Sequence, residues 1–339
     1  MEYINSPRTD PCWNLALEQY VFDSLDRSKS YFLLWQNHTT IVVGKNQNTV
    51  AEINSDFVRA HDITVVRRLS GGGAVYHDLG NLNFTFITDA DKMDGIDLHM
   101  FCVPIVETLR SFGVQAEISG RNDITVDGKK FSGNSQYVRE GRVMHHGTIM
   151  FDSDLTTVTQ ALQVDRDKIQ SKGIKSVASR VTNLRPYMPK GTTLAQFRQR
   201  LLEYLSAAET LHTLTLTAAD ETQIEAIRAA RYATWEWNYG RSPAYTDRRR
   251  CRFEGCGQVE VSLSVAQGKL ADIQFFGDFF GSGDTARLSQ LLLGCPYRRE
   301  DVLHRLETVD LETYIHNVTP AQLAELIVEW PHIKETPIV

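Results

Sequence analysis

The sequence predicts an α+β protein: a mixed, mostly antiparallel sheet flanked by helices, followed by a small α+β domain. Strand-like and helical stretches follow each other without the regular strand–helix–strand spacing of a doubly wound parallel sheet. Beyond a hydrophilic stretch near residue 247, a second series of strands and helices begins. The length of 339 residues also agrees with about two domains. We therefore expect one domain over residues 1–246 and a second over residues 247–339.

The first helix is expected to begin at Pro11. Asp10 is a typical N-terminal cap, and proline fits the first helical position. The apolar residues that follow fall on one helical stripe: Trp13, Ala16, Leu17, Tyr20 and Val21. Apolar, β-prone runs then predict strands over residues 31–36, 39–44, 63–68, 82–88 and 143–151.

A β-hairpin is predicted over residues 122–131, because Asp127-Gly128 is typical of a two-residue turn. Lys129 and Lys130 follow this turn. Successive side chains of a strand point to opposite faces, so at most one of the two lysines can face a site. A solvated lysine pair is the common alternative.

The C-terminal part is expected to open with a linker that contains Arg248, Arg249, Arg250 and Arg252. Neither half of the chain is basic, so a solvated linker is favoured over a nucleic-acid patch. Beyond it, alternating apolar residues predict a strand over residues 259–265, and Ile273 and Phe275 belong to the next one. Helices are expected over residues 285–293 and 320–329.

Composition narrows the class of protein. The formal net charge of −6 gives no basic field for nucleic acid or an anionic membrane. No apolar run reaches the roughly 18 residues that a membrane span needs, and residues 1–5 lack the pattern of a signal peptide. Five scattered cysteines are more typical of reduced thiols than of a disulfide framework. We expect a globular, cytoplasmic protein.

The most unusual segment runs from Arg67 to Asp78 and contains three consecutive glycines, residues 71–73. Such a run weakens a sheet but lets backbone approach a ligand closely. Arg67 and Arg68 add fixed positive charge, so the segment is a candidate cradle for an anion or a nucleotide. It matches neither a P-loop nor a dinucleotide motif. A bulged hairpin with surface arginines remains an equal alternative.

Two further segments carry polar residues. Asn122 and Asp123 precede the hairpin and could bind ribose or a hydrated cation. His145 and His146 are adjacent on a predicted strand, so they point to opposite faces and cannot easily ligate one metal. No cysteine or acidic group has metal-ligand spacing, and Ser70 lacks the motif of a nucleophilic serine. We expect neither a dedicated metal cage nor a catalytic triad.

Together these segments resemble the lipoate–protein ligase family, whose catalytic domain also resembles biotin–protein ligases. The segments that carry the resemblance, in chain order, are residues 9–18, 44–48, 67–83, 120–133, 145–148, 179–184, 235–243 and 277–281. The resemblance covers nearly the whole chain. It implies a biotin/lipoate ligase-like fold with a small C-terminal domain, which we expect to move as an adenylate forms.

The resemblance implies a two-step reaction. Lipoate and ATP, with Mg²⁺, give lipoyl-AMP, and a lysine of an acceptor protein then takes the lipoyl group. Lys130 is the implied catalytic lysine, contacting both substrates. The implied ATP-binding residues are Arg68, Gly73, Ala74, Val75, Tyr76 and Lys130. The implied lipoate-binding residues are Arg67, Ser70, Gly71, Gly72, Lys130, His145 and His146. Asn122 and Asp123 are placed near the phosphate or magnesium, and Val75 and Phe84 could line an apolar tunnel.

The implied partners are acceptor lipoyl domains, either E2 subunits of 2-oxoacid dehydrogenases or the glycine-cleavage H protein, which a monomeric enzyme would modify. Arg139, Arg142 and Lys172 are candidate docking cations, and solvated surface charge is the alternative for each.

An ATP-independent octanoyl or lipoyl transferase of the same fold is the nearest alternative. Some of those enzymes use a cysteine thioester, but residues 103–250 contain no cysteine. Cys102 is expected to be a buried structural thiol. A non-catalytic lipoate-binding protein is an alternative from another class, although Arg68 and Lys130 are both present.

Overall fold

The computed structural model describes residues 1–89, 98–120, 122–162, 181–208, 210–239, 247–266 and 268–328. Contacts within the chain divide it into two compact units. The first contains Met1–Val43, Val50–Arg68 and Ala74–Asn238. The second contains the C-terminal part of the chain from Tyr239 together with Gly44–Thr49 and Leu69–Gly73. Two short segments from the N-terminal part of the sequence therefore group with the C-terminal part, and the expected boundary at residue 246 stays a prediction.

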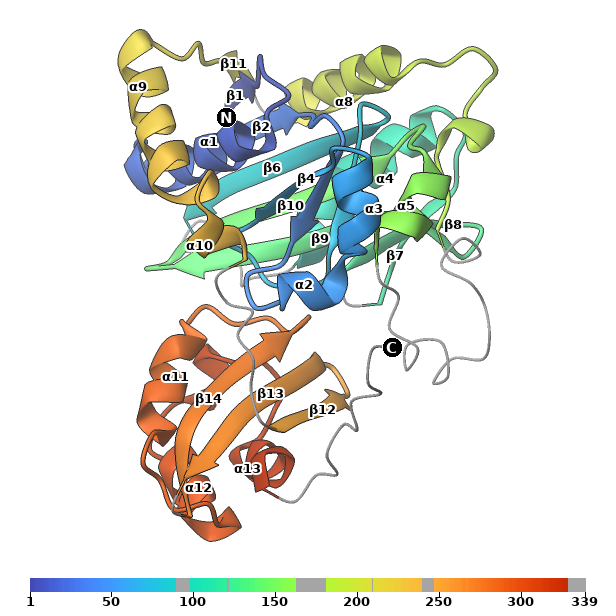
Figure 1. The fold of residues 1–339 in the computed structure, drawn as a ribbon. Coiled ribbons are helices and arrows are strands. Elements are labelled where there is room, and N and C mark those ends of the chain that lie inside the picture. The colour runs from blue at the N-terminus through green and yellow to red at the C-terminus, as the bar shows by residue number, and fades with distance from the viewer. Residues whose placement is uncertain are drawn as a thin grey trace. The chain divides into compact units, whose positions relative to one another are not determined.

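An eight-stranded mixed sheet forms the centre of the first unit, in the order β11-β1-β2-β6-β10-β9-β8-β7 (Figure 1). Only β1 pairs in parallel, with β2 and β11; the other pairs are antiparallel. The mixed, mostly antiparallel sheet predicted from the sequence is confirmed. The strands are β1 (Glu2–Asn5), β2 (Tyr31–Trp35), β6 (Asn81–Asp89), β7 (Ala116–Ser119), β8 (Asp123–Val126), β9 (Lys129–Arg139), β10 (Arg142–Met150) and β11 (His212–Thr213).

A second, three-stranded sheet in the same unit has the order β4-β3-β5. Its strands are β3 (Thr40–Val43), β4 (Thr64–Arg67) and β5 (Val75–His77). The α-helices of the unit are α1 (Pro11–Ser24), α2 (Thr49–Glu52), α3 (Ser55–Ala60), α4 (Leu98–Ser111), α5 (Leu155–Ala161), α8 (Leu194–Ala208), α9 (Ala218–Ile227) and α10 (Trp235–Asn238). The described residues of this unit also form two short helical turns, η2 (Arg185–Tyr187) and the π-helical η3 (Arg228–Tyr232).

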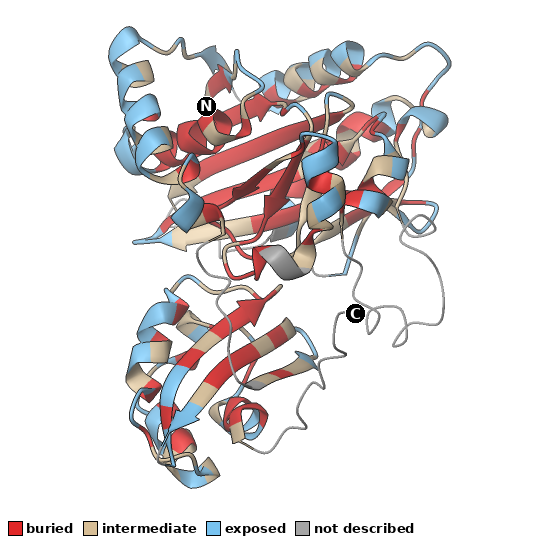
Figure 2. Ribbon diagram, viewed as in Figure 1, coloured by how far each residue is buried: buried red, intermediate tan, exposed pale blue. Residues whose placement is uncertain are grey.

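Helix α1 begins where the sequence predicts. The Asp10 carboxylate accepts hydrogen bonds from the backbone N–H groups of Cys12 and Trp13, which would otherwise lack partners at a helix start. The helix is buried over most of its length and not only along the expected stripe, as Figure 2 shows for the elements around the large sheet. Buried polar residues such as Glu18 therefore contact the sheet.

The two faces of the large sheet carry different residues, because side chains alternate along β6 and β10. Phe84 belongs to an apolar core that α4 and α8 complete, with Phe101 and Leu201 among its members. On the opposite face, Thr85 donates a hydrogen bond to Glu18 of α1. One face thus belongs to an apolar core, whereas the other carries buried polar groups such as Thr85.

The predicted hairpin is confirmed between β8 and β9. Asp127 and Gly128 have φ angles of 49° and 70°, the positive values that a two-residue hairpin turn of the primed type requires. Glycine has no steric penalty there, and aspartate tolerates this region better than most residues do.

The second unit contains the antiparallel sheet β12 (Asp247–Phe253), β13 (Gly257–Ala266) and β14 (Lys269–Gly277). Its helices are α11 (Thr285–Leu292), α12 (Arg299–Leu306) and α13 (Pro320–Val328), with a short turn η4 (Leu311–Thr313). The small α+β domain is confirmed, and α12 is an addition to the two helices expected. Alternate residues of β13, Val259, Val261 and Leu263, are fully buried in a separate apolar core.

The arginine run is not a linker, so that expectation was wrong. It forms β12, which pairs with β13 along its whole length. Arg249 is only 3% exposed, and its guanidinium lies 5.6 Å from the centre of the Tyr297 ring. An arginine packs in this way by burying its aliphatic stem and placing its planar charge over an aromatic face.

Candidate active site

Lys130 and Asp123 form an ion pair across β8 and β9, with 2.6 Å between Nζ and Oδ1. A register irregularity in this strand pair sets the arrangement, because Asp123 pairs with Gly133 whereas Thr125 pairs with Lys130. A Cβ at Gly133 would lie 2.9 Å from Nζ of Lys130, so the missing side chain leaves room for the lysine. Both charged side chains are partly exposed.

The structure distinguishes the two adjacent lysines. Lys129 pairs with Val126 at the turn and is exposed, whereas Lys130 is half-buried and paired with a carboxylate. The carbonyl of Lys130 accepts a hydrogen bond from the backbone N–H of Thr182. Lys130 is therefore the lysine held by the fold.

Polar groups continue from Lys130 across the same face of the large sheet. Thr148 on β10 accepts a hydrogen bond from the backbone N–H of Gly133 at 3.2 Å. Two residues away, His146 lies with Nδ1 3.0 Å from Oε1 of Glu18. Sequence reasoning missed Glu18, and its only signal was an acidic residue among the apolar positions of the first predicted helix.

His145 points to the other face. Its ring stacks on Phe101 at 4.7 Å, and its nitrogens contact Gln136 and Asn134. Burial, with a smaller effect of the His146 charge, lowers the pKa of His145 to about 3. The structure therefore does not bring His145 together with Lys130, and Phe84 of the expected tunnel lies in the same apolar core.

The two arginines before the glycine run have different surroundings. Arg67 is fully buried and donates to the carbonyls of Trp237 and Asn238, so it holds α10 against β4. Arg68 is also buried and donates from Nη1 to the carbonyl of Val42 at 3.2 Å. Burial lowers the pKa of Arg68 to about 10, and the negative charge of Glu18 opposes that shift. Arg68 thus remains a cation at neutral pH.

Ser70, Gly71, Gly72 and Gly73 belong to the second unit. There the carbonyl of Ser70 accepts a hydrogen bond from the backbone N–H of Lys45, and a Cβ on Gly71 would lie 2.4 Å from the carbonyl oxygen of Phe279. Gly72 has a φ of 88°, which favours glycine. Nothing lies within 4 Å of a Cβ placed on Gly73.

The remaining predicted residues lie in the first unit. Ala74 and Val75 are partly exposed, and Tyr76 is buried. Burial, followed by the charge of Asp78, raises the pKa of Tyr76. Asn122, next to Asp123, donates from Nδ2 to the carbonyl of Asn134 at 2.8 Å.

Two of the expected docking cations are placed by the structure, and Lys172 lies outside the described residues. Arg142 is only 2% exposed and donates to the carbonyls of Phe22 and Leu25, so its expected role as a surface cation was wrong. Arg139 is exposed and forms an ion pair with Asp23.

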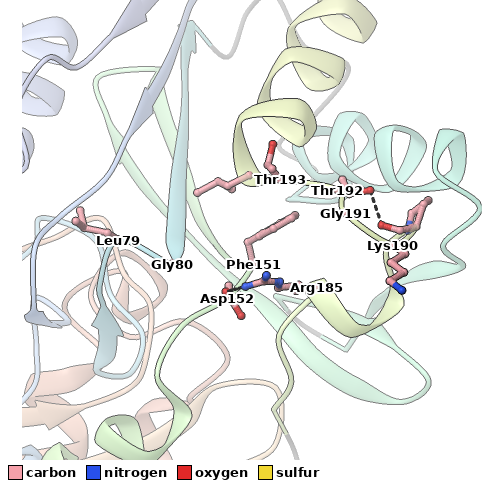
Figure 3. A pocket seen from close by; sticks show the side chains of 11 residues that line it. Leu79, Gly80, Phe151, Asp152, Arg185, Lys190, Gly191, Thr192 and Thr193 are labelled. Atoms are coloured by element: carbon pink, nitrogen blue, oxygen red, sulfur yellow. Dashed lines mark hydrogen bonds and ion pairs between the residues drawn. The ribbon is translucent and has the colours of Figure 1, made fainter.

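A pocket of about 610 Å³ lies at the ends of β6 and β10 and was not expected from the sequence (Figure 3). Arg185 and Asp152 form an ion pair in its wall. The segment that follows Val181 connects this pocket to Lys130, because Val181 bridges to Lys130 and the backbone N–H of Arg185 donates to the carbonyl of Phe151. The other lining residues are Leu79, Gly80, Pro189, Lys190, Gly191, Thr192, Thr193 and Leu194.

Family comparisons give the class of protein that carries this fold and site. Residues 10–206 match the lipoyl protein ligase A/B catalytic domain family, and residues 242–327 match the bacterial lipoate protein ligase C-terminus family. The fold is also that of LipL1 from P. falciparum, solved with lipoate (TM-score 0.78, 24% identity, 94% of this chain and 96% of that chain). A structure of lipoate-protein ligase A bound with ATP matches with a TM-score of 0.59 at 23% identity, covering 71% of this chain and 96% of that chain.

Sequence relatives define the family. A lipoate-protein ligase of Bacillus subtilis is 44% identical over 95% of this chain and 98% of its own length. A lipoate–protein ligase of Staphylococcus aureus is 43% identical over 96% of this chain and its own full length. The chain belongs to the lipoate–protein ligase family, as the resemblance of its motifs implied, and it is an enzyme of the ligase class. Among the described helices, none combines the length and apolar composition that a membrane crossing requires.

Proposed function

We propose that the protein activates free lipoate with ATP to form enzyme-bound lipoyl-AMP, and then transfers the lipoyl group to a lysine of an acceptor protein. Family membership supports the substrate class, and the Lys130–Asp123 pair carries the chemistry. The proposed acceptors are lipoyl domains of E2 subunits or the glycine-cleavage H protein. The solved relative from Thermoplasma acidophilum is described with its E2 lipoyl domain, which supports this class of acceptor.

In the first step, a lipoate carboxylate oxygen attacks the α-phosphorus of ATP, and pyrophosphate leaves. Two anions must approach each other, so fixed cations have to offset their repulsion. Lys130 is the cation we assign to the reacting carboxylate and α-phosphate, with Asp123 fixing the position of its ammonium. Arg68 supplies a second, buried cation for the nucleotide.

The backbone from Gly73 to Tyr76 is proposed to bind ATP, and the segment from Ser70 to Gly72 to shape the lipoate site. Arg67, which donates to the carbonyls of Trp237 and Asn238, is proposed to shape the lipoate site together with that segment. Of the two histidines, His146 is assigned to the lipoate site, since it lies on the face that carries Lys130.

Mg²⁺ fits beside this pair. A half-exposed carboxylate, Asp123, and the amide oxygen of Asn122 are oxygen ligands of the kind that Mg²⁺ uses together with substrate phosphates. No group of three or more His, Cys, Asp or Glu side chains in the described chain forms a cage of its own. When bound, the ion would neutralise charge on the phosphate oxygens.

In the second step, the neutral amine of the acceptor lysine attacks the carbonyl carbon of lipoyl-AMP. An amide bond forms, AMP leaves, and the amine gives up a proton to solvent. Lys130 would hold the adenylate in place while the acceptor approaches.

A transferase that works through a cysteine thioester is the competing function. Cys102 is buried in α4, within the apolar core. Cys12 donates to the carbonyl of Tyr232, and burial together with Asp10 raises its pKa to about 11. A thiol nucleophile reacts as the thiolate, so neither cysteine of the first unit suits that chemistry.

Pyrophosphate release and acceptor modification test the proposal together. Purified protein with lipoate, ATP and Mg²⁺ should release pyrophosphate and add one lipoyl group to an acceptor, as measured by mass spectrometry. Omission of nucleotide should stop both. Transfer from octanoyl-carrier protein without nucleotide would instead identify the competing transferase.

A further inference from the structure

A buried histidine in the first unit has no part in the mechanism above. His77 is the last residue of β5 and is 2% exposed. Its Nε2 has no hydrogen-bond partner among the residues that the structure describes. Burial of an unpaired polar nitrogen costs free energy, so such a group at a candidate site points to a ligand atom.

A chain of hydrogen bonds determines which nitrogen of His77 carries the proton. Asn14 Nδ2 lies 2.9 Å from the carbonyl of Gln36, an obligatory acceptor, so this side-chain atom must be the amide nitrogen. The same nitrogen lies 2.9 Å from Asn37 Oδ1. Asn37 therefore directs its Nδ2 at Nδ1 of His77, 3.1 Å away. Nδ1 is the acceptor, and the neutral ring carries its proton on Nε2.

His77 is neutral at physiological pH. Burial lowers the pKa of His77 to about 3, and electrostatic interactions with Arg68 and then His146 act in the same direction. Nε2 is thus a hydrogen-bond donor that carries no net charge.

The position of His77 relates it to Lys130 through the large sheet. The His77 ring lies edge-on to Trp35, with 6.0 Å between ring centres. Trp35 pairs with Asn83 on β6, Asn83 pairs with Thr148 on β10, and Thr148 bonds to Gly133 on β9. Neighbouring strands are about 4.7–4.9 Å apart, so this row of residues, which runs from Trp35 to Gly133, crosses three strand spacings, or about 14 Å.

This row gives the orientation of lipoate under the proposed function. If the carboxylate lies at Lys130, the acyl chain extends across β10 and β6, and the far end of the molecule reaches Trp35 and His77. That end is a dithiolane ring in lipoate. Its sulfur atoms are weak hydrogen-bond acceptors, whereas the methyl end of octanoate accepts no hydrogen bond.

We propose that His77 determines the specificity for lipoate over octanoate, an inference that rests on the proposed function. The Nε2–H group of His77 donates a hydrogen bond to a dithiolane sulfur of bound lipoate. Octanoate would leave this buried donor unpaired, and a site built around a hydrogen bond rejects an analogue that lacks the partner. The contact favours lipoate over octanoate and forms no covalent bond.

Three variants test the proposal through one ratio, kcat/KM for lipoate divided by kcat/KM for octanoate, measured as pyrophosphate release without acceptor. His77→Phe removes the donor, and the ratio should fall about three- to ten-fold, the range expected for one hydrogen bond. His77→Gln places an amide nitrogen near the position of Nε2 and should restore most of the ratio. His61→Gln replaces an exposed histidine that stacks on Phe57, and it should leave the ratio unchanged.

An unchanged ratio in His77→Phe would overturn the proposal, whether both acids lose activity equally or neither does, because a structural role would affect both alike. If that variant does not fold, His77→Asn, which keeps a polar group beside Asn37 but lacks a donor at Nε2, carries the same test. Calorimetric affinities for the two acids without ATP provide a second readout. Failure of the proposed function is distinct, since the wild-type protein would then release no pyrophosphate with either acid.

Discussion

Nζ of Lys130 lies 2.6 Å from Oδ1 of Asp123, and the missing side chain of Gly133 leaves the space that the lysine occupies. A cation held by its neighbours is already placed when an anionic substrate arrives. Preorganised charge of this kind is usually the largest contribution that an enzyme makes to reactions between anions.

Replacement of Lys130 should therefore stop the first step. We expect Lys130→Ala to abolish ATP- and lipoate-dependent pyrophosphate release, because the cation between the carboxylate and the α-phosphate is lost. Lys129→Ala is the matched control and should retain activity, since Lys129 is exposed at the turn. Equal loss in both variants would show that the charge of the hairpin matters and not the position of Lys130.

Asp123→Asn should reduce pyrophosphate release without abolishing it. The amide keeps the size of the side chain but removes the charge that fixes the ammonium and could bind Mg²⁺. A raised Mg²⁺ requirement, measured by titration of the metal at fixed ATP, is the expected signature. Wild-type Mg²⁺ dependence in this variant would contradict a role for Asp123 at the phosphates.

The small C-terminal domain should be needed more for the first step than for the second. A chain that ends at Asp247 should be impaired in adenylation, yet transfer from supplied lipoyl-AMP should be retained to a larger extent. The two apolar cores contain different residues, so the first unit should fold without the second core. Equal loss of both steps would count against this division of roles.

Buried neutral histidines should make stability depend on pH. The pKa of His145 is about 3 in the folded protein and about 6.5 when unfolded, so between these values the unfolded chain binds more protons. The contribution of His145 to the free energy of unfolding is therefore fully present above pH 6.5. It falls as the pH drops towards 3, by up to about 1.4 kcal/mol per pH unit.

Urea unfolding at pH 7 and pH 5 checks this expectation. The wild-type protein should lose more stability between the two values than His145→Gln does. His61→Gln, at an exposed position, should behave as the wild type. An identical pH dependence in wild type and His145→Gln would contradict the assignment of a neutral, buried His145.

Gly147→Ala should destabilise the fold by about 1–3 kcal/mol, the usual cost of forcing atoms into a packed core. A Cβ at this position would lie 2.2 Å from Oδ1 of Asn134 and 2.5 Å from the Phe84 ring. Gly73→Ala is the matched control for stability, because nothing lies within 4 Å of its Cβ. Thermal unfolding should separate the two variants by several degrees.

Much of the fold was predictable because its signals are local. Asp10-Pro11 determines the start of α1, and Asp127-Gly128 determines the turn of the hairpin. The glycine run was noticed for the same reason, since unusual residues stand next to each other there. Lys130 was assigned only through the resemblance to the ligase family, because its local sequence did not distinguish it from Lys129. The arginine run was misinterpreted because its partners, β13 and Tyr297, are distant in the sequence.

The sequence by itself determined the family, the strand and helix types, and the small set of residues among which the site had to be found. Only the tertiary structure decided between neighbours within that set. A register irregularity between β8 and β9 places Lys130 beside Asp123. Alternation on β10 directs His146 to Glu18 and His145 into the core. These choices depend on register and on which layer covers each face, and contacts between residues far apart in the chain fix both.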